Sequence, residues 1–195
     1  MLYEIAHIIK NRFLFLWKVV EWGNATLFYL MHKKKLMEIN SVLEQVSNVY
    51  RFRTTTEEDV KKLVDFFARQ PEEAFEFFKP HGFDVKSIKK LQRNKAFLAY
   101  VLLDGHQISG YCFNRSFFHG KGFRGRMVDI DYRGMGLGIM MNRILNKVGF
   151  GIGLKVFETV NKDNIASYRS AMSASNVRIL EELDGKDLYL EILKV

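Results

Sequence analysis

The stretch from Val128 to Met141, VDIDYRGMGLGIMM, places three glycines at alternate positions between a strand-like run and a helix-like run. Gly134, Gly136 and Gly138 would weaken either element, because glycine loses more backbone entropy on folding than any other residue. They indicate a backbone conformation that other residues resist, or a group that approaches the backbone closely. A strand leading through such a turn into a helix also exposes the free N–H groups of the helix start, which attract anions. The stretch therefore predicts a strand–turn–helix unit with an anion site at its turn.

The residues around this unit alternate between strand-like and helix-like periods. Before the turn, the pattern predicts a strand at 50–53, helices at 57–67, 71–78 and 85–93, and strands at 96–103, 107–113 and 123–130. After the turn, it predicts a helix ending at Gly149, a strand at 154–160, a helix at 161–173 and a hairpin of strands at 177–183 and 188–193. With 195 residues, 48% of them hydrophobic, the chain suits one α/β domain with an appendage.

Two common nucleotide-binding loops do not fit the glycines. The dinucleotide fingerprint G-x-G-x-x-G requires glycine where Ile139 stands, and the P-loop requires Lys and then Ser or Thr where the chain has Ile139-Met140. The pattern Arg/Gln-x-x-Gly-x-Gly/Ala does fit, as Arg133-Gly-Met-Gly-Leu-Gly138. It resembles the acyl-coenzyme A pyrophosphate loop of the GNAT-type acetyltransferase superfamily. The order of elements over 49–195 is also similar to that superfamily, with one extra short helix before the strand at 96–103.

The resemblance implies a mixed, mostly antiparallel central sheet, splayed between its fourth and fifth strands, with helices on both faces. Acetyl-coenzyme A would be the acyl donor, and its pantetheine arm would lie in the splay, paired with the backbone near Val128. Asn164 and Ser167 form an N-x-x-S pattern on the last helix, and they would bind the pantetheine or cap the helix. The pyrophosphate would lie on the glycine loop, where the expected coenzyme-binding residues are Arg133, Gly134, Met135, Gly136, Leu137, Gly138 and Ile139.

In this superfamily an acceptor amine attacks the thioester directly, and the departing thiolate requires an acid. The acid is often a tyrosine on the last helix, seven residues after an asparagine. Tyr168 has this spacing from Asn161. A competing register starts the motif at Asn164, which puts Ala171 at the tyrosine position and leaves no tyrosine acid. Tyr168 is therefore a candidate acid, with packing or a place beside the acceptor as its alternative role.

The amine also requires a base, and two carboxylates are candidates. Asp129 and Glu158 lie at strand ends near the expected splay, and either could instead face solvent on its strand. Cys112, the single cysteine, lies within a strand and is expected to be a small core residue. A lone cysteine excludes an intramolecular disulfide framework and fits a reducing cytoplasm. No cluster of metal-ligating residues is visible in the sequence.

The formal net charge of +8 suits nucleic acid, an anionic membrane or a phosphorylated ligand. Its distribution favours the phosphorylated ligand, because stretches without any acid, at 106–127 and 133–156, lie on both sides of the glycine loop. No recognised nucleic-acid motif accompanies the charge, so nucleic acid is not an expected partner.

Residues 1–48 form an apolar and basic extension to the domain expected at 49–195. The run FLFLWKVVEW at 13–22 is very apolar, but Lys18 and Glu21 interrupt it, so it is not expected to cross a membrane. Two interpretations follow. The favoured one is a pair of helices packed on the domain or on a second subunit, as in a homodimer. In the other, residues 13–35 lie on a membrane, at its inner cytoplasmic face, with lysines near lipid phosphates.

The predicted function is that of an acetyl-coenzyme A-dependent N-acetyltransferase with a small-molecule amine as its acceptor. Aromatic and basic residues at 57–93 and 114–122 would suit an amino sugar or a nucleotide-linked amino sugar. The resemblance extends more loosely to acyltransferases of bacterial surface-polysaccharide pathways. The alternative is a non-catalytic acyl-coenzyme A-binding module with a membrane- or partner-binding N-terminal segment.

Overall fold

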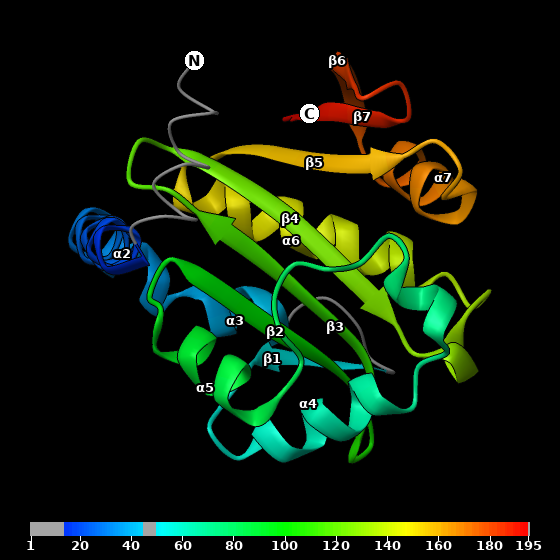
Figure 1. Ribbon diagram of the computed structural model, residues 1–195, viewed down its shortest axis with the longest axis horizontal. Coiled ribbons are helices and arrows are strands. Elements are labelled where there is room, and N and C mark those ends of the chain that lie inside the picture. The colour runs from blue at the N-terminus through cyan, green and yellow to red at the C-terminus, as the bar shows by residue number, and fades with distance from the viewer. Residues whose placement is uncertain (1–13, 45–49, 195) are drawn as a thin grey trace.

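The protein, seen in a computed structural model that describes residues 14–44 and 50–194, is built on a seven-stranded sheet (Figure 1). The strands follow the order β1-β2-β3-β4-β5-β7-β6, and every pair is antiparallel except β4 with β5. Their bounds are β1 Arg51–Thr54, β2 Phe97–Asp104, β3 Gln107–Ser116, β4 Lys121–Val128, β5 Lys155–Asn161, β6 Asn176–Leu183 and β7 Asp187–Leu193. The predicted mixed sheet is confirmed. Val49, the predicted start of the domain, lies outside the described residues.

Helices cover both faces of this sheet (Figure 1). They are α2 Leu14–Met37, α3 Ile39–Glu44, α4 Asp59–Ala68, α5 Val85–Arg93, α6 Leu137–Ile152 and α7 Ile165–Ala174, with short 3-10 turns η1 Glu72–Phe75 and η2 Ile130–Tyr132. A hydrophobic core lies on each face of the sheet. Successive side chains of β2 point to opposite faces, so alternate residues of this strand pack in different cores. Tyr100 packs in the cluster that contains α6 residues, whereas Val101 packs with the phenylalanines of α4.

The helix predicted at 71–78 is wrong, since only the 3-10 turn η1 forms there. Two of its phenylalanines pack around a residue further along the chain, whereas Phe77 is 40% exposed. The ring of Phe75 lies 4.9 Å from that of Phe83, and the ring of Phe78 lies 6.3 Å from it. The conformation of this segment is therefore set by packing on Phe83, and the phenylalanines do not form one face of a regular helix.

Gly149 does not end α6, contrary to the prediction. The helix continues to Ile152 and ends at Gly153, which has a left-handed φ of +98°. A Cβ atom on Gly149 would lie 2.6 Å from Cγ2 of Val156 on β5. Gly149 thus allows α6 to pack closely against the sheet, which is a tertiary requirement.

The described part of the N-terminal extension packs on the domain, as the favoured interpretation predicted. Phe28 of α2 is fully buried in the α6 cluster. The Asn24 side chain donates to the carbonyl of Ser116 at 3.1 Å and accepts from the N–H of Phe118 at 3.0 Å. Lys35 Nζ donates to the carbonyl of Ile152 at 3.0 Å. Among the described helices, none has the length and apolarity needed to cross a membrane.

Candidate active site

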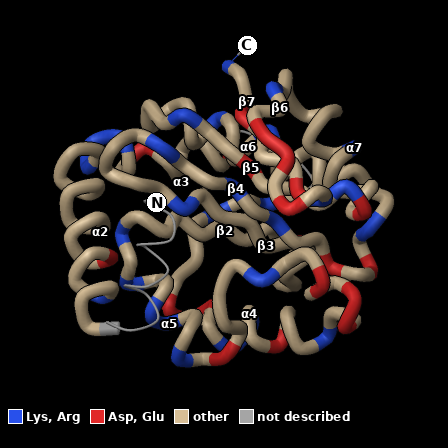
Figure 2. Tube along the Cα trace, turned by 45° about the horizontal axis from the view of Figure 1, so that its top comes forward, with Lys and Arg blue, Asp and Glu red and all other residues tan. Residues whose placement is uncertain are grey.

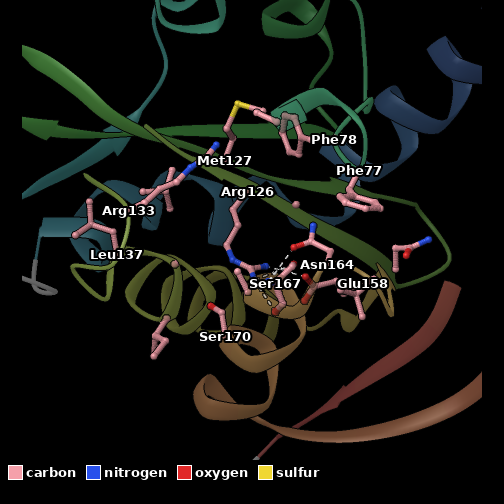
Figure 3. Close-up of a pocket in the computed structure, with 18 of the residues that line it drawn as sticks. Phe77, Phe78, Arg126, Met127, Arg133, Leu137, Glu158, Asn164, Ser167 and Ser170 are labelled. Atoms are coloured by element: carbon pink, nitrogen blue, oxygen red, sulfur yellow. Dashed lines mark hydrogen bonds and ion pairs between the residues drawn. The ribbon is translucent and has the colours of Figure 1, made fainter. Parts of the chain in front are cut away.

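A fork in the sheet lies between β4 and β5. The two strands pair in parallel only where Lys121–Phe123 meets Lys155–Phe157, and they separate beyond that point. The splay predicted between the fourth and fifth strands is therefore present. A pocket of about 510 Å³ occupies the fork, bounded by both strands, the glycine loop, the start of α7 and η1 (Figure 3). Its volume is in the range of small-molecule and cofactor sites.

The glycines of the loop are required for two different physical reasons. Gly134 and Gly136 adopt φ of +80° and +79°, a left-handed conformation that residues with side chains rarely take, and the space around them is open. Gly138 is already in the first turn of α6. A Cβ atom there would lie 3.1 Å from Ser170 Oγ and 3.7 Å from Arg126 Nε. Backbone conformation therefore explains Gly136, and close packing of α6 on α7 explains Gly138.

The start of α6 is suited to an anion. Its first turn contains no acidic residue, and Gly136 caps it with a backbone that leaves no side chain in the way. The N–H groups of Leu137 and Gly138 open the helix and have no preceding turn to bond to. The positive end of the helix dipole adds to their attraction for negative charge. Arg133, whose side chain is exposed, lines the same pocket.

Most of the coenzyme-binding residues expected from the sequence come together here. The pocket is lined by Val128, Arg133, Gly134, Gly136, Leu137, Gly138, Ile139, Asn164 and Ser167. Met135 is the exception, because it lies outside the lining and is 61% exposed.

Two arginines and one carboxylate are buried at the bottom of the fork. Arg124 Nε donates to Glu158 Oε2 at 2.8 Å, and Arg126 Nη1 donates to Glu158 Oε1 at 2.7 Å. Arg126 also reaches from β4 to α7, where Nη2 donates to Ser167 Oγ at 3.2 Å (Figure 3). The site prediction missed both arginines. Their alternate positions on one strand, which put them on one face, were the available signal.

Glu158, a candidate base, lies at the pocket but is held by this cluster. Burial raises its pKa, but the charges of Arg126 and Arg124 and their hydrogen bonds outweigh burial and bring the pKa below its usual value. A carboxylate whose pKa is lowered holds a proton weakly and is a poor general base. The geometry makes Glu158 the shared counter-charge of the two arginines.

Asp129, the other candidate base, does not line the pocket. Its side chain is fully buried and forms an ion pair with Arg69, with 2.6 Å between Arg69 Nε and Asp129 Oδ2. It also accepts hydrogen bonds from Gln70 Nε2 at 3.2 Å and from the N–H of Asp131 at 3.1 Å. Asp129 thus joins the end of α4 to the turn that leads into the glycine loop.

Tyr168, the candidate acid, also lies outside the pocket lining. It packs against the cluster formed by Val160, Ala171, Leu188 and Leu190. Helix α7 begins after Asn164, whose Oδ1 accepts from the N–H of Ser167 at 3.1 Å. This helix start agrees with the register that begins at Asn164, in which fully buried Ala171 stands at the tyrosine position.

One carboxylate at the pocket was not anticipated. Glu73 of η1 is exposed and lines the pocket beside Phe77 and Phe78. No ion pair of Glu73 occurs within residues 14–44 and 50–194. Glu73 was not singled out from the sequence, because a helix was expected at 71–78. The position of Glu73 at the pocket depends on the 3-10 turn η1, which forms there instead.

Comparison with known proteins gives matches in structure only. Neither a family model nor a curated protein matches the sequence. The aminoglycoside acetyltransferase AAC(6')-Ib in complex with coenzyme A and kanamycin matches with a TM-score of 0.58 and 18% identity, covering 73% of this chain and 93% of that one. The fold is that of the GNAT acetyltransferases.

Two further GNAT structures agree with this assignment. The GNAT domain of S. lividans PAT matches with a TM-score of 0.62 and 15% identity, over 73% of this chain and 89% of that one. The ribosomal alpha-N-protein acetyltransferase RimL in complex with coenzyme A matches with a TM-score of 0.61 and 15% identity, over 75% of this chain and 94% of that one. At such identities the likeness concerns the GNAT fold alone.

Proposed function

We propose that the protein is an acetyl-coenzyme A-dependent N-acetyltransferase in which an acceptor amine attacks the thioester directly. One observation carries the proposal: the β4–β5 fork and the left-handed glycine loop at the start of α6 open into the same pocket. Two of the matching GNAT structures are complexes with coenzyme A, which supports the same ligand here.

The residues of the fork fit a coenzyme with a pyrophosphate and a long amide-containing arm. The first N–H groups of α6 and the side chain of Arg133 would hold the phosphates. Beyond Phe123, the edge of β4 that faces the fork has no partner strand in β5, so its backbone up to Val128 is available to the amides of the arm. Ser167 and Asn164 line the opposite side of the pocket. When bound, the coenzyme would supply the acetyl thioester.

The charges in the fork suit the release of a thiolate without a tyrosine acid. Arg124 and Arg126 carry two positive charges against the single negative charge of Glu158, so the buried cluster keeps an excess positive charge beside the pocket. Such a preorganised charge favours an anion that develops during reaction. We propose that exposed Glu73 attracts the acceptor as an ammonium ion, which releases its proton to solvent before the neutral amine attacks the thioester. The C–S bond then breaks as the new C–N bond forms, and the arginine cluster stabilises the departing thiolate.

We propose an amino sugar, free or linked to a nucleotide, as the acceptor. Phe77 and Phe78 give the pocket an apolar wall on which a sugar ring could pack. Glu73 lines the pocket beside them, where its carboxylate could pair with an amine. One matching structure contains kanamycin, an aminoglycoside acceptor of that protein, which supports a sugar amine here.

A non-catalytic acyl-coenzyme A-binding module is the second candidate, with an N-terminal segment that binds a membrane or a partner. It is favoured by one observation, the packing of Tyr168 away from the pocket, with Ala171 at the alternative tyrosine position.

Calorimetry of acetyl-coenzyme A binding tests the proposal. Gly136→Glu should abolish binding, because it adds a negative charge and a strained φ at the proposed phosphate site. Gly151→Glu is the matched control, since it adds the same charge to an open position near the other end of α6 and should bind as wild type.

Thiol release with amino sugars would then separate the two candidates. Binding with amine-dependent thiol release establishes the enzyme. Binding without thiol release across amino sugars, aminoglycosides and peptides supports the module. No binding by folded wild-type protein refutes both.

A further inference from the structure

Helix α2 exposes an apolar face that nothing in the described structure covers. In Figure 2 it lies at one edge of the molecule, with few charged residues along it. Nine large apolar side chains of this helix are exposed, from 46% at Leu27 to 77% at Met37. They are Phe15, Leu16, Val19, Val20, Trp22, Leu27, Leu30, Met31 and Met37. We call this set the α2 stripe.

The members of the α2 stripe share one side of the helix. At 3.6 residues per turn, their positions fall within about half of the helix circumference. The other side carries Phe28, Asn24 and Lys35, which attach α2 to the domain. A helix that is apolar on both sides is normally covered on both sides. A contiguous exposed apolar patch of this kind marks an interaction surface.

The charges on α2 indicate what kind of surface could cover the α2 stripe. The helix contains four lysines and one acid, Glu21. Glu21 forms an ion pair with Lys90, with 3.1 Å between Oε2 and Nζ. Lys35 Nζ donates a hydrogen bond to the carbonyl of Ile152. The exposed charges that remain on α2 are Lys18, Lys33 and Lys34, and all are positive.

A second copy of the chain would place its own lysines near these lysines, and the like charges would repel. In an antiparallel pair of α2 helices, Lys33 and Lys34 would lie towards Lys18 of the other copy, and in a parallel pair they would face each other. An anionic lipid surface complements both properties of the helix, because acyl chains cover the apolar stripe and phosphates pair with the lysines.

The position of α2 leaves the pocket accessible. Lys35 contacts the C-terminal end of α6, whereas the glycine loop lies at its N-terminal end, 16 residues away. That separation is about 24 Å along the helix. Figure 1 shows α2 and α7 at opposite ends of the molecule. We propose that α2 lies along an anionic membrane surface with the α2 stripe facing the lipid, and that the pocket remains in water.

Vesicle flotation and tryptophan fluorescence of the whole chain test this proposal. Wild-type protein should float with vesicles of phosphatidylcholine and phosphatidylglycerol, with a blue shift because Trp22, 70% exposed, enters the interface. It should bind pure phosphatidylcholine much more weakly. The double variant Lys33→Gln/Lys34→Gln should bind about thirtyfold less, since each lysine near an anionic surface contributes roughly a fivefold factor.

The apolar arm of the test uses a matched pair of double variants. Val19→Ser/Leu30→Ser should lose at least about tenfold in vesicle binding, because it removes two members of the stripe. Ile179→Ser/Leu180→Ser removes two exposed apolar side chains of β6 and should bind as wild type. Circular dichroism confirms that each variant is folded, and none of these measurements needs the coenzyme.

Three results would overturn the proposal. One is a folded wild-type protein that does not float with anionic vesicles at low salt. Another is binding that survives Val19→Ser/Leu30→Ser unchanged. The third is a dimer, detected by light scattering, that this variant separates, because the α2 stripe would then be an interface between copies.

Discussion

Replacing Glu158 by glutamine tests whether this residue is a base or a structural counter-charge. The substitution keeps the shape of the side chain and removes its charge. In the structure, Arg124 is fully buried, Arg126 is 6% exposed, and Glu158 is their shared partner. A structural counter-charge predicts a loss of stability, whereas a simple base predicts a loss of turnover with stability unchanged.

The magnitude follows from the burial of the three side chains. Removing one partner of a buried ion pair costs about 3–5 kcal/mol, because the remaining charge stays buried without compensation. Glu158→Gln leaves two such charges, although the amide oxygen can still accept one hydrogen bond. We therefore expect the free energy of unfolding to fall by about 3–5 kcal/mol, out of a total of roughly 5–15 kcal/mol for a domain.

Urea denaturation followed by circular dichroism measures this loss, with Glu182→Gln as the control. Glu182 pairs with Lys162 on the surface, where the two side chains are 46% and 43% exposed, so its loss should cost less than about 1 kcal/mol. A Glu158→Gln variant as stable as this control would refute the structural role.

The dependence on pH is a second check on the same pair. The pKa of Glu158 is lowered in the folded protein, so the pair stabilises the fold fully above the carboxyl pKa of the unfolded chain. The difference between wild type and Glu158→Gln should therefore shrink as the pH falls through the lowered pKa. A difference that stays constant into strong acid would contradict this assignment.

Three further predictions concern single residues. Gly136→Ala should lower the free energy of unfolding by about 1–2 kcal/mol through its left-handed φ, whereas Gly151→Ala in an open position of α6 should raise it by roughly 1 kcal/mol, as thermal unfolding will show. Cys112 is fully buried, which raises its pKa, so a thiol reagent should react only after denaturant is added; fast reaction in the native state would contradict its core position. Burial lowers the pKa of His81, so stability should decline as the pH falls through the usual histidine range. His81→Gln should show a smaller decline in urea titrations at several pH values, since the pKa of His32 is lowered by burial too.

Local features of the fold were predicted well from the sequence. Helix α5 occupies 85–93 as expected, and Asp84 caps it by accepting from the N–H of Ser87 at 3.0 Å. The hairpin between β2 and β3 turns at Gly105, with a left-handed φ of +56°. These elements depend on caps, turns and periodicity within a few residues, which the sequence displays directly. The glycine loop belongs with them, because a left-handed turn before a helix is a local requirement.

The roles of the charged residues were decided by the tertiary structure. Asp129 is neutralised by Arg69, 60 positions earlier, and Glu158 by Arg124, 34 positions earlier. Likewise, Gly149 has no room for a side chain because Val156 of β5 packs against it. Tyr168, a candidate acid by its spacing from Asn161, packs outside the pocket lining. A carboxylate at a strand end looks the same in sequence whether it is free or paired. Only folding, which brings distant residues within hydrogen-bonding distance and removes water from them, settles its charge and its chemistry.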